Sequence, residues 1–364
     1  MKYKRHVYDR ISNEFLLFTL ATLFFLKIII YSLVKSEVIS FSLGGGSDAY
    51  YYDAYAQRSI NIALNIWPVI LRYLNDVNLY SRDFVSYIFL LLNMLVIPIT
   101  VAKLAGIKIS VNQKYYFYIV LICLLYPTLY FFTFDIYRDV FMVLCFLIGC
   151  VVVKAALTTK SSLIFISLFI VSIIIGWFLA ALRPYLGVAF IGALFLWSIR
   201  FTKRKIVFLS ILYLLILFIA NYIGVLEPLT EYRSGFEESE GGSTLGLSFS
   251  NPILFIPNFI LSFLGQMLGL YVTNPLALVL LLIETAPFFF MLIYVIKNIK
   301  WADKFVRFLI IFFVLYASVW LIGNDNLGTA VRLRMYNYFA IYISFFYILK
   351  LKNLSLKRLQ VVSS

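Results

Sequence analysis

Arginines concentrated in a few short segments are the side chains of this 364-residue sequence best suited to chemistry. Arg183 precedes a proline, and Arg332 and Arg334 stand two residues apart before the last apolar stretch. A guanidinium group is planar and permanently charged, so it binds phosphate or carboxylate through paired hydrogen bonds, which lysine cannot do. We therefore expect these arginines to bind an anionic ligand. The alternative is that they neutralise nearby acids or lipid phosphates.

A carboxylate beside tyrosines follows the glycine run Gly44-Gly45-Gly46. The sequence predicts a helix that starts near Asp48, in which Asp48, Tyr52 and Tyr55 share one face. Such a face suits a sugar, because the ring stacks on the tyrosines while its hydroxyl groups need acceptors. The alternative for the tyrosines is the aromatic belt of a membrane interface.

A second carboxylate lies in the run Asp135-Ile-Tyr-Arg138-Asp139. On a continuous helix Asp135 and Asp139 face the same way, and the helix dipole favours a carboxylate at the first turn. Arg138 and Asp139 are equally consistent with a solvated helix cap. Neither the spacing nor the residue types specify a metal site, so we expect no metal and no cofactor.

The single histidine, His6, lies near the amino terminus, away from all these segments. A histidine base, a Ser/His/Asp triad and a histidine-ligated zinc are therefore excluded there. The three cysteines, Cys123, Cys145 and Cys150, lie in apolar stretches, so no disulfide is expected in the loops. Any chemistry must depend on carboxylates, arginines, tyrosines and backbone dipoles.

The elements that position these residues are membrane helices. The chain is 63% hydrophobic and 13% charged, which excludes a soluble domain and predicts an all-α polytopic membrane protein. Stretches of about 20 apolar residues match the bilayer thickness at the helical rise. Ten spans are predicted, at 15–34, 84–105, 115–134, 140–157, 162–182, 186–199, 206–224, 276–296, 305–322 and 337–350.

Lysine and arginine separate between the loops of this topology. If the basic amino terminus (Lys2, Lys4, Arg5, Arg10) is cytoplasmic, the inward loops and the tail hold nearly all the lysines. The outward loops hold Lys35 and eight arginines: Arg58, Arg72, Arg82, Arg138, Arg183, Arg233, Arg332 and Arg334. The positive-inside rule accounts for the lysines but predicts few outward arginines. The net charge of +14 is then a matter of topology and anionic-lipid contact, and no nucleic-acid partner is expected.

The chain is predicted to be one transmembrane domain, 1–364, with two long outward segments. In segment 35–83, polar residues recur every three or four positions over 58–76, which is typical of a helix lying in the interface. In segment 225–275, the stretch 253–272 is predicted to be re-entrant or interfacial. Its acidic part, with Glu237, Glu238 and Glu240, is either a lid or an ordinary solvated loop. Together the two segments could form a vestibule for a lipid-linked substrate.

Two further predictions concern geometry. If the chain is extended at Arg332 and Arg334 their side chains point the same way, whereas on a helix they diverge and only one faces the site. Lys27 and Glu284 lie at similar depths inside their spans, roughly 10 to 12 Å below the outer edge. Because isolated charges there are costly, we expect them to form a neutralising pair.

The chain resembles the bacterial polysaccharide polymerases, namely the O-antigen polymerase Wzy and the EpsG-like family. The resemblance rests on four short motifs: Gly-Gly-Ser-Asp48-Ala-Tyr-Tyr-Tyr, Tyr137-Arg138-Asp139, Arg183-Pro184-Tyr185, and Arg332-Leu-Arg334-Met-Tyr-Asn-Tyr-Phe339. It implies a glycosyltransferase C-like fold in the bacterial inner membrane, with both termini cytoplasmic and a periplasmic active site. The related ligases use an outer histidine, which this chain lacks.

The resemblance implies a metal-independent reaction that joins undecaprenyl-diphosphate-linked oligosaccharides. Arg183, Arg332 and Arg334 would stabilise the departing diphosphate, and Asp48 or Asp139 would activate the acceptor hydroxyl. Arg138, Tyr52, Tyr55 and Arg58 are further expected substrate contacts. The expected partners are the lipid-linked substrate, membrane lipid and a chain-length regulator protein. The alternatives are a polyprenyl-phosphate-sugar glycosyltransferase that adds one sugar, or a flippase or transporter of lipid-linked glycan.

Overall fold

The computed structural model of the chain describes residues 11–39, 46–235 and 243–362. This described part is helical and contains no strand, which confirms an all-α polytopic membrane protein. Several residues discussed above lie outside the described ranges: Lys2, Lys4, Arg5, His6, Arg10, Gly44, Gly45, Glu237, Glu238 and Glu240.

Seven helical segments in the described ranges are long and apolar enough to cross a membrane. They are Asn13–Lys35 (α1), Arg82–Leu104 (α4 Arg82–Leu91, η2 Leu92–Val96 and α5 Ile97–Leu104), Arg138–Thr158 (α8), Ser162–Leu182 (α9), Arg204–Tyr222 (in α11, Lys203–Tyr222), Pro275–Lys297 (α14 Pro275–Leu280, η5 Leu281–Thr285 and α15 Ala286–Lys297) and Lys304–Gly323 (α16). All seven correspond to predicted spans.

The other three predicted spans have different forms. Span 115–134 is divided into α6 (Gln113–Leu124) and α7 (Pro127–Phe131), because Pro127 cannot continue the preceding helix. Span 186–199 is the short helix α10 (Pro184–Leu196). Span 337–350 lies within the 36-residue helix α17 (Leu327–Val362). The total of ten spans therefore stays a prediction.

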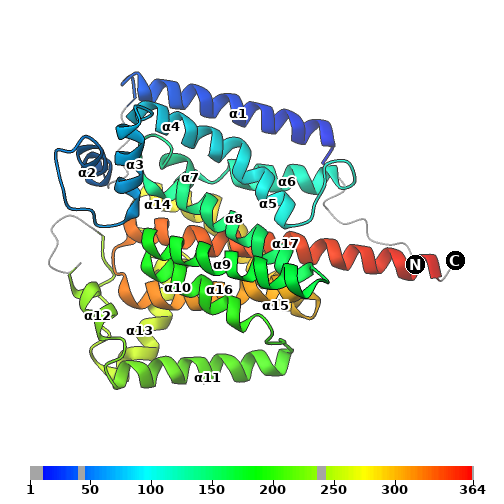
Figure 1. Ribbon diagram of the computed structural model, residues 1–364. Coiled ribbons are helices and arrows are strands. Elements are labelled where there is room, and N and C mark those ends of the chain that lie inside the picture. The colour runs from blue at the N-terminus through cyan, green and yellow to red at the C-terminus, as the bar shows by residue number, and fades with distance from the viewer. Residues whose placement is uncertain (1–10, 40–45, 236–242, 363–364) are drawn as a thin grey trace.

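Figure 1 shows the long helices running side by side, with α2 (Gly46–Ala56), α3 (Ile66–Asp76) and α12 (Glu227–Ser234) at one end of the bundle. α3 lies across the helix ends, as expected for an interfacial helix. The prediction of one helix over 58–76 is wrong, because the helix begins only at Ile66. Asn65 caps it by accepting a hydrogen bond from the Trp67 backbone N–H at 3.0 Å, and 59–65 is not helical.

The two ends of the bundle differ in their cations. At one end the Lys154 ammonium donates to the Leu104 carbonyl at 2.8 Å, and the Lys350 ammonium donates to the Gly106 carbonyl at 2.6 Å. We call this the lysine end. Arg138 on α8 and Arg332 on α17 lie roughly 25 Å from these lysines at the helical rise. They mark the opposite end, the arginine end, which also carries α2 and α3 (Figure 1).

The centre of the bundle is aromatic and is built around α17. Tyr336, Tyr338, Phe339 and Tyr342 are all buried on this helix, which packs against α15, α16 and α8. The Tyr338 ring stacks on Phe288 with ring centroids 3.9 Å apart. Rigid aromatic packing of this kind holds the first turns of α17, which carry Arg332 and Arg334, in a fixed place.

A short apolar segment precedes α14 at the arginine end. It comprises η3 (Pro252–Leu254), α13 (Phe255–Ser262) and η4 (Phe263–Met267). The chain then turns at Gly269, whose φ of +60° favours glycine, and a Cβ there would lie 2.9 Å from an Arg334 nitrogen. The backbone therefore approaches Arg334 closely at this turn. A second short element, η6 (Ile299–Trp301), joins α15 to α16.

Two predicted pairings are wrong. The Lys27 ammonium donates to Asn93 Oδ1 at 3.3 Å and lies 4.3 Å from the centre of the Tyr130 ring, whereas Glu284 pairs with Arg334. Lys27 is thus held by a neutral amide and an aromatic ring, and Glu284 by a guanidinium group. Asp135 and Asp139 do not share a helix face, because α8 begins at Arg138 and Asp135 lies in the preceding turn.

Candidate functional site

Arg332 is the centre of the candidate site at the arginine end. Its Nη1 donates to Asp48 Oδ2 at 2.7 Å, while Nε and Nη2 donate to Asp139 Oδ2 at 3.1 and 2.8 Å. The guanidinium group also lies 5.0 Å from the centre of the Phe132 ring. Residues from α2, α8 and α17 therefore meet at one cation, although they are far apart in the sequence.

Arg183 approaches the same carboxylate from another side. It ends α9 and precedes Pro184, the first residue of α10, so the helix break fixes its position. Its Nη2 lies 3.6 Å from Asp139 Oδ1, and the side chain is buried. Within the described residues, Arg183 Nε and Nη1 have no hydrogen-bond acceptor. Asp139 is thus the ionic partner of Arg183, although two Arg183 nitrogens donate no hydrogen bond to the described residues.

Other unsatisfied polar atoms surround this pair. Arg138 Nη1 donates to the Leu182 carbonyl at 2.8 Å, but its Nε has no acceptor among the described residues. Asp139 Oδ1 and the hydroxyl groups of Tyr316 and Tyr336 also lack hydrogen bonds there. Buried polar groups in proteins are nearly always hydrogen-bonded, so a concentration of exceptions marks a place that binds water or a polar ligand.

Arg334 lies deeper and has its own carboxylate. Its Nη2 donates to Glu284 Oε2 at 3.0 Å, and the Thr128 backbone N–H donates to Glu284 Oε1 at 2.7 Å. Glu284 is fully buried in the π-helical segment η5. Arg334 Nε has no acceptor in the described ranges. Arg334 therefore keeps a free donor while its charge is neutralised.

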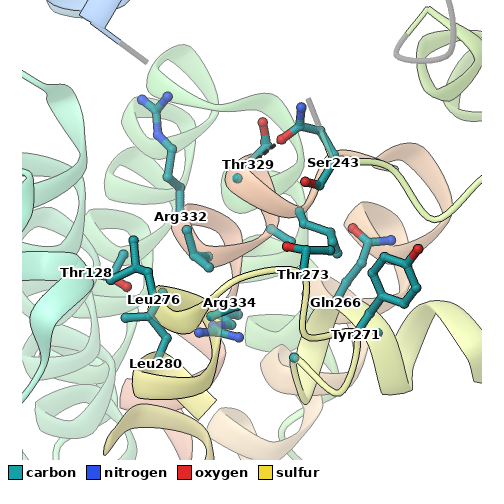
Figure 2. Close-up of a pocket in the computed structure, with 18 of the residues that line it drawn as sticks. Thr128, Ser243, Gln266, Tyr271, Thr273, Leu276, Leu280, Thr329, Arg332 and Arg334 are labelled. Atoms are coloured by element: carbon teal, nitrogen blue, oxygen red, sulfur yellow. Dashed lines mark hydrogen bonds between the residues drawn. The ribbon is translucent and has the colours of Figure 1, made fainter. Parts of the chain in front are cut away.

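A cavity of about 500 Å³ joins these two arginines. Figure 2 shows Arg332 and Arg334 at different levels of the first turns of α17, with Leu276 and Leu280 of α14 beside them. The lining combines arginine and other polar side chains with the apolar Leu276, Ala277 and Leu280, so the cavity is amphipathic. The lining comprises Asp48, Thr128, Phe131, Phe132, Ser243, Gly265, Gln266, Gly269, Tyr271, Thr273, Asn274, Leu276, Ala277, Leu280, Asn326, Leu327, Gly328, Thr329, Ala330, Val331, Arg332 and Arg334.

The prediction that only one of the two arginines on a helix can face the site is wrong. Arg332 and Arg334 do lie on a helix, yet both line the cavity. The reason is that the cavity surrounds the start of α17, where Leu327–Val331 also contribute to the lining. Arg332 and Arg334 reach it from different sides, each beside its own carboxylate.

Tyr52 and Tyr137 border the cluster without lining the cavity. Burial raises the pKa of Tyr52, and it raises the pKa of Tyr137 to about 12. Both phenols therefore keep their protons at neutral pH. Neither can serve as a general base there.

Three other predicted contacts lie outside the lining. Arg58 is exposed and pairs with Asp76 at 2.7 Å. The ring of Tyr55 is covered by the Arg72 guanidinium at 3.6 Å, so this face is not free for a sugar. Arg138 contacts the cluster around Asp139 from the interior. Among the predicted site residues, the structure brings Asp48, Asp139, Arg138, Arg183 and Arg332 together. Of these, Asp48 and Arg332 line the cavity, as does Arg334, whereas Asp139, Arg138 and Arg183 lie behind the lining.

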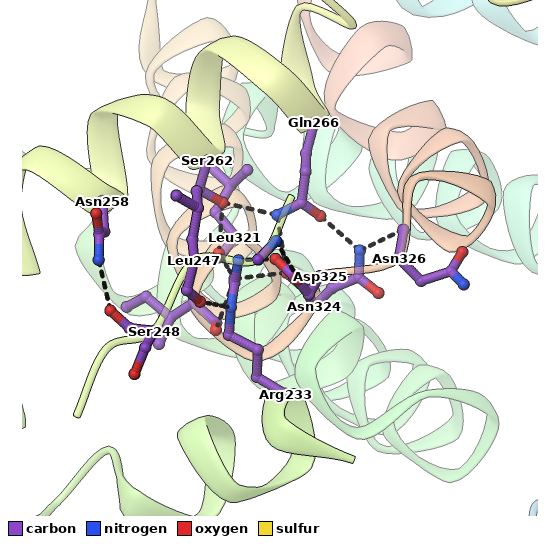
Figure 3. A network of polar contacts seen from close by, with 12 residues as sticks. Arg233, Leu247, Ser248, Asn258, Ser262, Gln266, Leu321, Asn324, Asp325 and Asn326 are labelled. Atoms are coloured by element: carbon purple, nitrogen blue, oxygen red, sulfur yellow. Dashed lines mark hydrogen bonds and ion pairs between the residues drawn. The ribbon is translucent and has the colours of Figure 1, made fainter. Parts of the chain in front are cut away.

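Two further arginines, Arg82 and Arg233, have structural partners. Arg82 binds Asp135 through two hydrogen bonds, of 2.7 and 2.5 Å. Arg233 donates to the carbonyls of Leu247, Leu321, Ile322 and Asn324 and forms an ion pair with the buried Asp325 (Figure 3). The described part of 225–275 is thus attached to the ends of α16 and α17. Gly246 adds a hydrogen bond from its N–H to Asp325 Oδ2 at 2.9 Å.

Sequence reasoning missed the role of Glu284 and Thr128 in this site. Glu284 was assigned to Lys27, and Thr128 was not singled out. The signal that could have found them is Pro127, which breaks the helix inside an apolar span and frees the next backbone N–H groups for a carboxylate. Among the described residues, no group of three or more His, Cys, Asp or Glu side chains is arranged to hold a metal ion.

Comparisons of the chain with protein families, with curated proteins and with solved structures give no match.

Proposed function

We propose that the chain is a glycosyltransferase of the bacterial cytoplasmic membrane that polymerises oligosaccharide repeat units carried on undecaprenyl diphosphate. The observation that carries the proposal is the amphipathic cavity: Arg332 and Arg334, the latter with an Nε that has no acceptor among the described residues, line it together with Leu276, Ala277 and Leu280. A diphosphate on a polyprenyl chain has the same two-part chemistry. Its anionic head matches the arginines, and its tail matches Leu276, Ala277 and Leu280.

The surroundings of α14 support lateral access for such a tail. Leu276 lines the cavity, while Leu278 and Val279 on the same helix are 47% and 44% exposed. In a helix that crosses the membrane, exposed apolar side chains face lipid. A lipid-linked substrate could therefore reach the cavity from the bilayer without leaving it. We propose ten spans in total, with a glycosyltransferase C-like fold.

The proposed orientation places the arginine end in the periplasm and the lysine end in the cytoplasm. Lys103, Lys154 and Lys350 then follow the positive-inside rule. The start of α1 and the end of α17 lie at the lysine end, so both termini would be cytoplasmic (Figure 1). Repeat units that have been moved across the membrane would then meet the cavity, and a chain-length regulator protein would act at the same face.

In the proposed reaction, an acceptor hydroxyl oxygen attacks the anomeric carbon of the donor glycan. The new glycosidic bond forms as the bond between that carbon and the diphosphate oxygen breaks, and undecaprenyl diphosphate leaves with the electron pair. Arg332, Arg183 and Arg334 would stabilise the charge that develops on the leaving group. Asp139, enclosed between two guanidinium groups, would be a positioning residue. Asp48, which lines the cavity, would receive the hydroxyl proton.

Deletion of the gene tests the proposal directly. Gel analysis of surface polysaccharide should change from a ladder of repeat units to a single-repeat band, and expression of the wild-type gene should restore the ladder. If the gene encoded an enzyme that adds one sugar from a polyprenyl phosphate, its deletion would instead shorten the repeat unit itself. If the gene encoded a flippase, its deletion would remove the single-repeat band as well, because no repeat units would reach the outer face. Either of these results would overturn the proposal that the chain is a polymerase.

A further inference from the structure

The carboxylates on Arg332 differ sharply in their surroundings. Asp139 is fully buried and lies between Arg332 and Arg183. The Asp48 side chain is 38% exposed, lines the cavity, and contacts Arg332 through Nη1 alone at 2.7 Å. Breaking the Asp139 pair would leave a buried charge, whereas the Asp48 carboxylate can return to water at little cost. One half of the Arg332 fork is therefore permanently occupied, and the other half is held by a replaceable acid.

The body of α2 is fixed, so only the Asp48 side chain needs to move. Ala49, Tyr52 and Ala56 of this helix are buried, and Asp53 accepts a hydrogen bond from the Tyr80 hydroxyl at 2.6 Å. Side-chain rotation of a partly exposed residue is fast compared with typical turnover. An exchange at Arg332 therefore requires no domain motion.

Charge favours such an exchange. The guanidinium groups of Arg138, Arg183 and Arg332 face the carboxylates of Asp48 and Asp139, which leaves the cluster positive. A phosphate oxygen makes the same charge-assisted hydrogen bonds to a guanidinium fork as a carboxylate, and it carries more charge. The arriving anion can therefore take the Nη1 position of Arg332, on the same cavity that the Arg334 guanidinium group lines.

On the basis of the proposed function, we propose that the donor diphosphate displaces Asp48 from Arg332. The freed Asp48 carboxylate then serves as the base for the acceptor hydroxyl. While Asp48 is bound to Arg332, its Oδ2 is occupied by the hydrogen bond from Nη1. Once phosphate occupies Arg332, the carboxylate is free and stands beside the bound donor. The base is thus active only when a donor is present, which orders the two substrates: donor first, acceptor second.

The proposed step conserves protons and electrons. The acceptor hydroxyl gives its proton to Asp48, its oxygen forms the bond to the anomeric carbon, and the diphosphate oxygen leaves with the bonding electron pair. After the diphosphate departs, Arg332 is again available to Asp48, which releases its proton to water and returns to the ion pair. No oxidant, reductant or second co-reactant is required.

The test compares binding with turnover in the purified full-length protein. The probe is geranylgeranyl diphosphate, and inorganic diphosphate provides an arm without the lipid tail. In Asp48→Asn the competing charge is gone, so geranylgeranyl diphosphate should bind about twofold to fivefold more tightly than to wild type. Chain extension with lipid-linked repeat units should fall by about 10²-fold or more, because the base is lost.

The matched control is Asp76→Asn, which removes the same charge from the exposed pair with Arg58, away from the cavity lining. It should change neither binding nor chain extension, and Asp48→Glu should recover part of the chain extension. Unchanged or weaker diphosphate binding in Asp48→Asn would overturn the exchange. Wild-type chain extension in Asp48→Asn would overturn the role as base. If wild type makes no polymer at all but Asp48→Asn still binds diphosphate more tightly, the proposed function fails while the exchange at Arg332 stands.

Discussion

Arg183 and Arg233 are both buried arginines at the same end of the bundle, yet they are used in opposite ways. Arg233 donates to four backbone carbonyls and pairs with Asp325, so its donors are fully employed in joining loop 243–249 to α16 and α17. Arg183 has one long contact with Asp139, and two of its nitrogens have no acceptor in the described part of the chain. Burial alone therefore does not distinguish a structural arginine from a binding one. Unused donors do.

The difference also concerns what the protein loses without each side chain. Removal of Arg233 would leave the Asp325 carboxylate buried without its cation, with only the Gly246 N–H still donating to it, and would take a donor from four carbonyls. Removal of Arg183 would leave Asp139 still bound to Arg332. Stability should depend on the first arginine, and ligand binding on the second. The following predictions test this division.

The largest effect on stability is expected from Arg233→Met. The change leaves the Asp325 charge buried and unpaired, which costs about 3 to 5 kcal/mol. The measurement is thermal unfolding of the purified protein in detergent, followed by the amount folded at 37 °C. Arg233→Met with Asp325→Asn should recover part of the loss, because no uncompensated charge remains. A fully stable single variant would contradict the structural role of Arg233.

Arg183→Lys should affect activity most. Lysine keeps the charge but not the planar fork, so the leaving diphosphate loses paired hydrogen bonds. We expect a loss of about 10²- to 10³-fold in chain extension, similar to the loss of an oxyanion donor. The rate is measured from the appearance of polymer on a gel.

Thermal unfolding provides the control for this variant. Because Arg183 is poorly satisfied in the folded protein, Arg183→Lys should unfold within a few degrees of wild type. A stable and fully active lysine variant would show that the fork is not needed. A strong loss of stability would place Arg183 in the same class as Arg233.

The pair of Arg334 and Glu284 should fall between these extremes. Glu284 neutralises Arg334 and also accepts the Thr128 N–H, so the pair combines structure with a free Arg334 donor. A double-mutant cycle with Arg334→Gln and Glu284→Gln should give a coupling of about 0.5 to 3 kcal/mol in unfolding. If the double variant is stable and binds geranylgeranyl diphosphate like wild type, the pair is structural only.

The sequence was sufficient to predict the seven helical segments that are long and apolar enough to cross a membrane, because long apolar runs are required by the bilayer thickness. It also located Arg183 correctly at a helix break, since Pro184 can only begin a new helix. It failed for Lys27 and Glu284. Helical rise gives the depth of a residue along the membrane normal, but not its angular position around the bundle. The neighbour of Glu284 is therefore decided by helix packing, which brings Arg334 to it.

The same limit applies to the Asp139 cluster. Asp139 and Arg332 are 193 positions apart, and no local pattern joins them. Residue types and loop positions indicated that both lie at the same end of the bundle, and their hydrogen bond confirms this location. Whether an arginine has spare donors depends on every surrounding carbonyl, so Arg183 and Arg233 cannot be told apart before the fold is known. Their function remains a proposal that the variants above can test.

The smallest effect is expected where an outward arginine is exposed. Arg58 is 66% exposed and its ion pair with Asp76 is open to solvent and salt. Such pairs contribute about 0 to 1 kcal/mol, so Arg58→Gln should leave unfolding and chain extension close to wild type. The measurements are the same two assays, run beside Arg183→Gln. If Arg58→Gln lost as much chain extension as Arg183→Gln, a substrate would have to reach beyond the cavity to the far side of α2. Unused donors would then no longer be the feature that separates binding arginines from the rest.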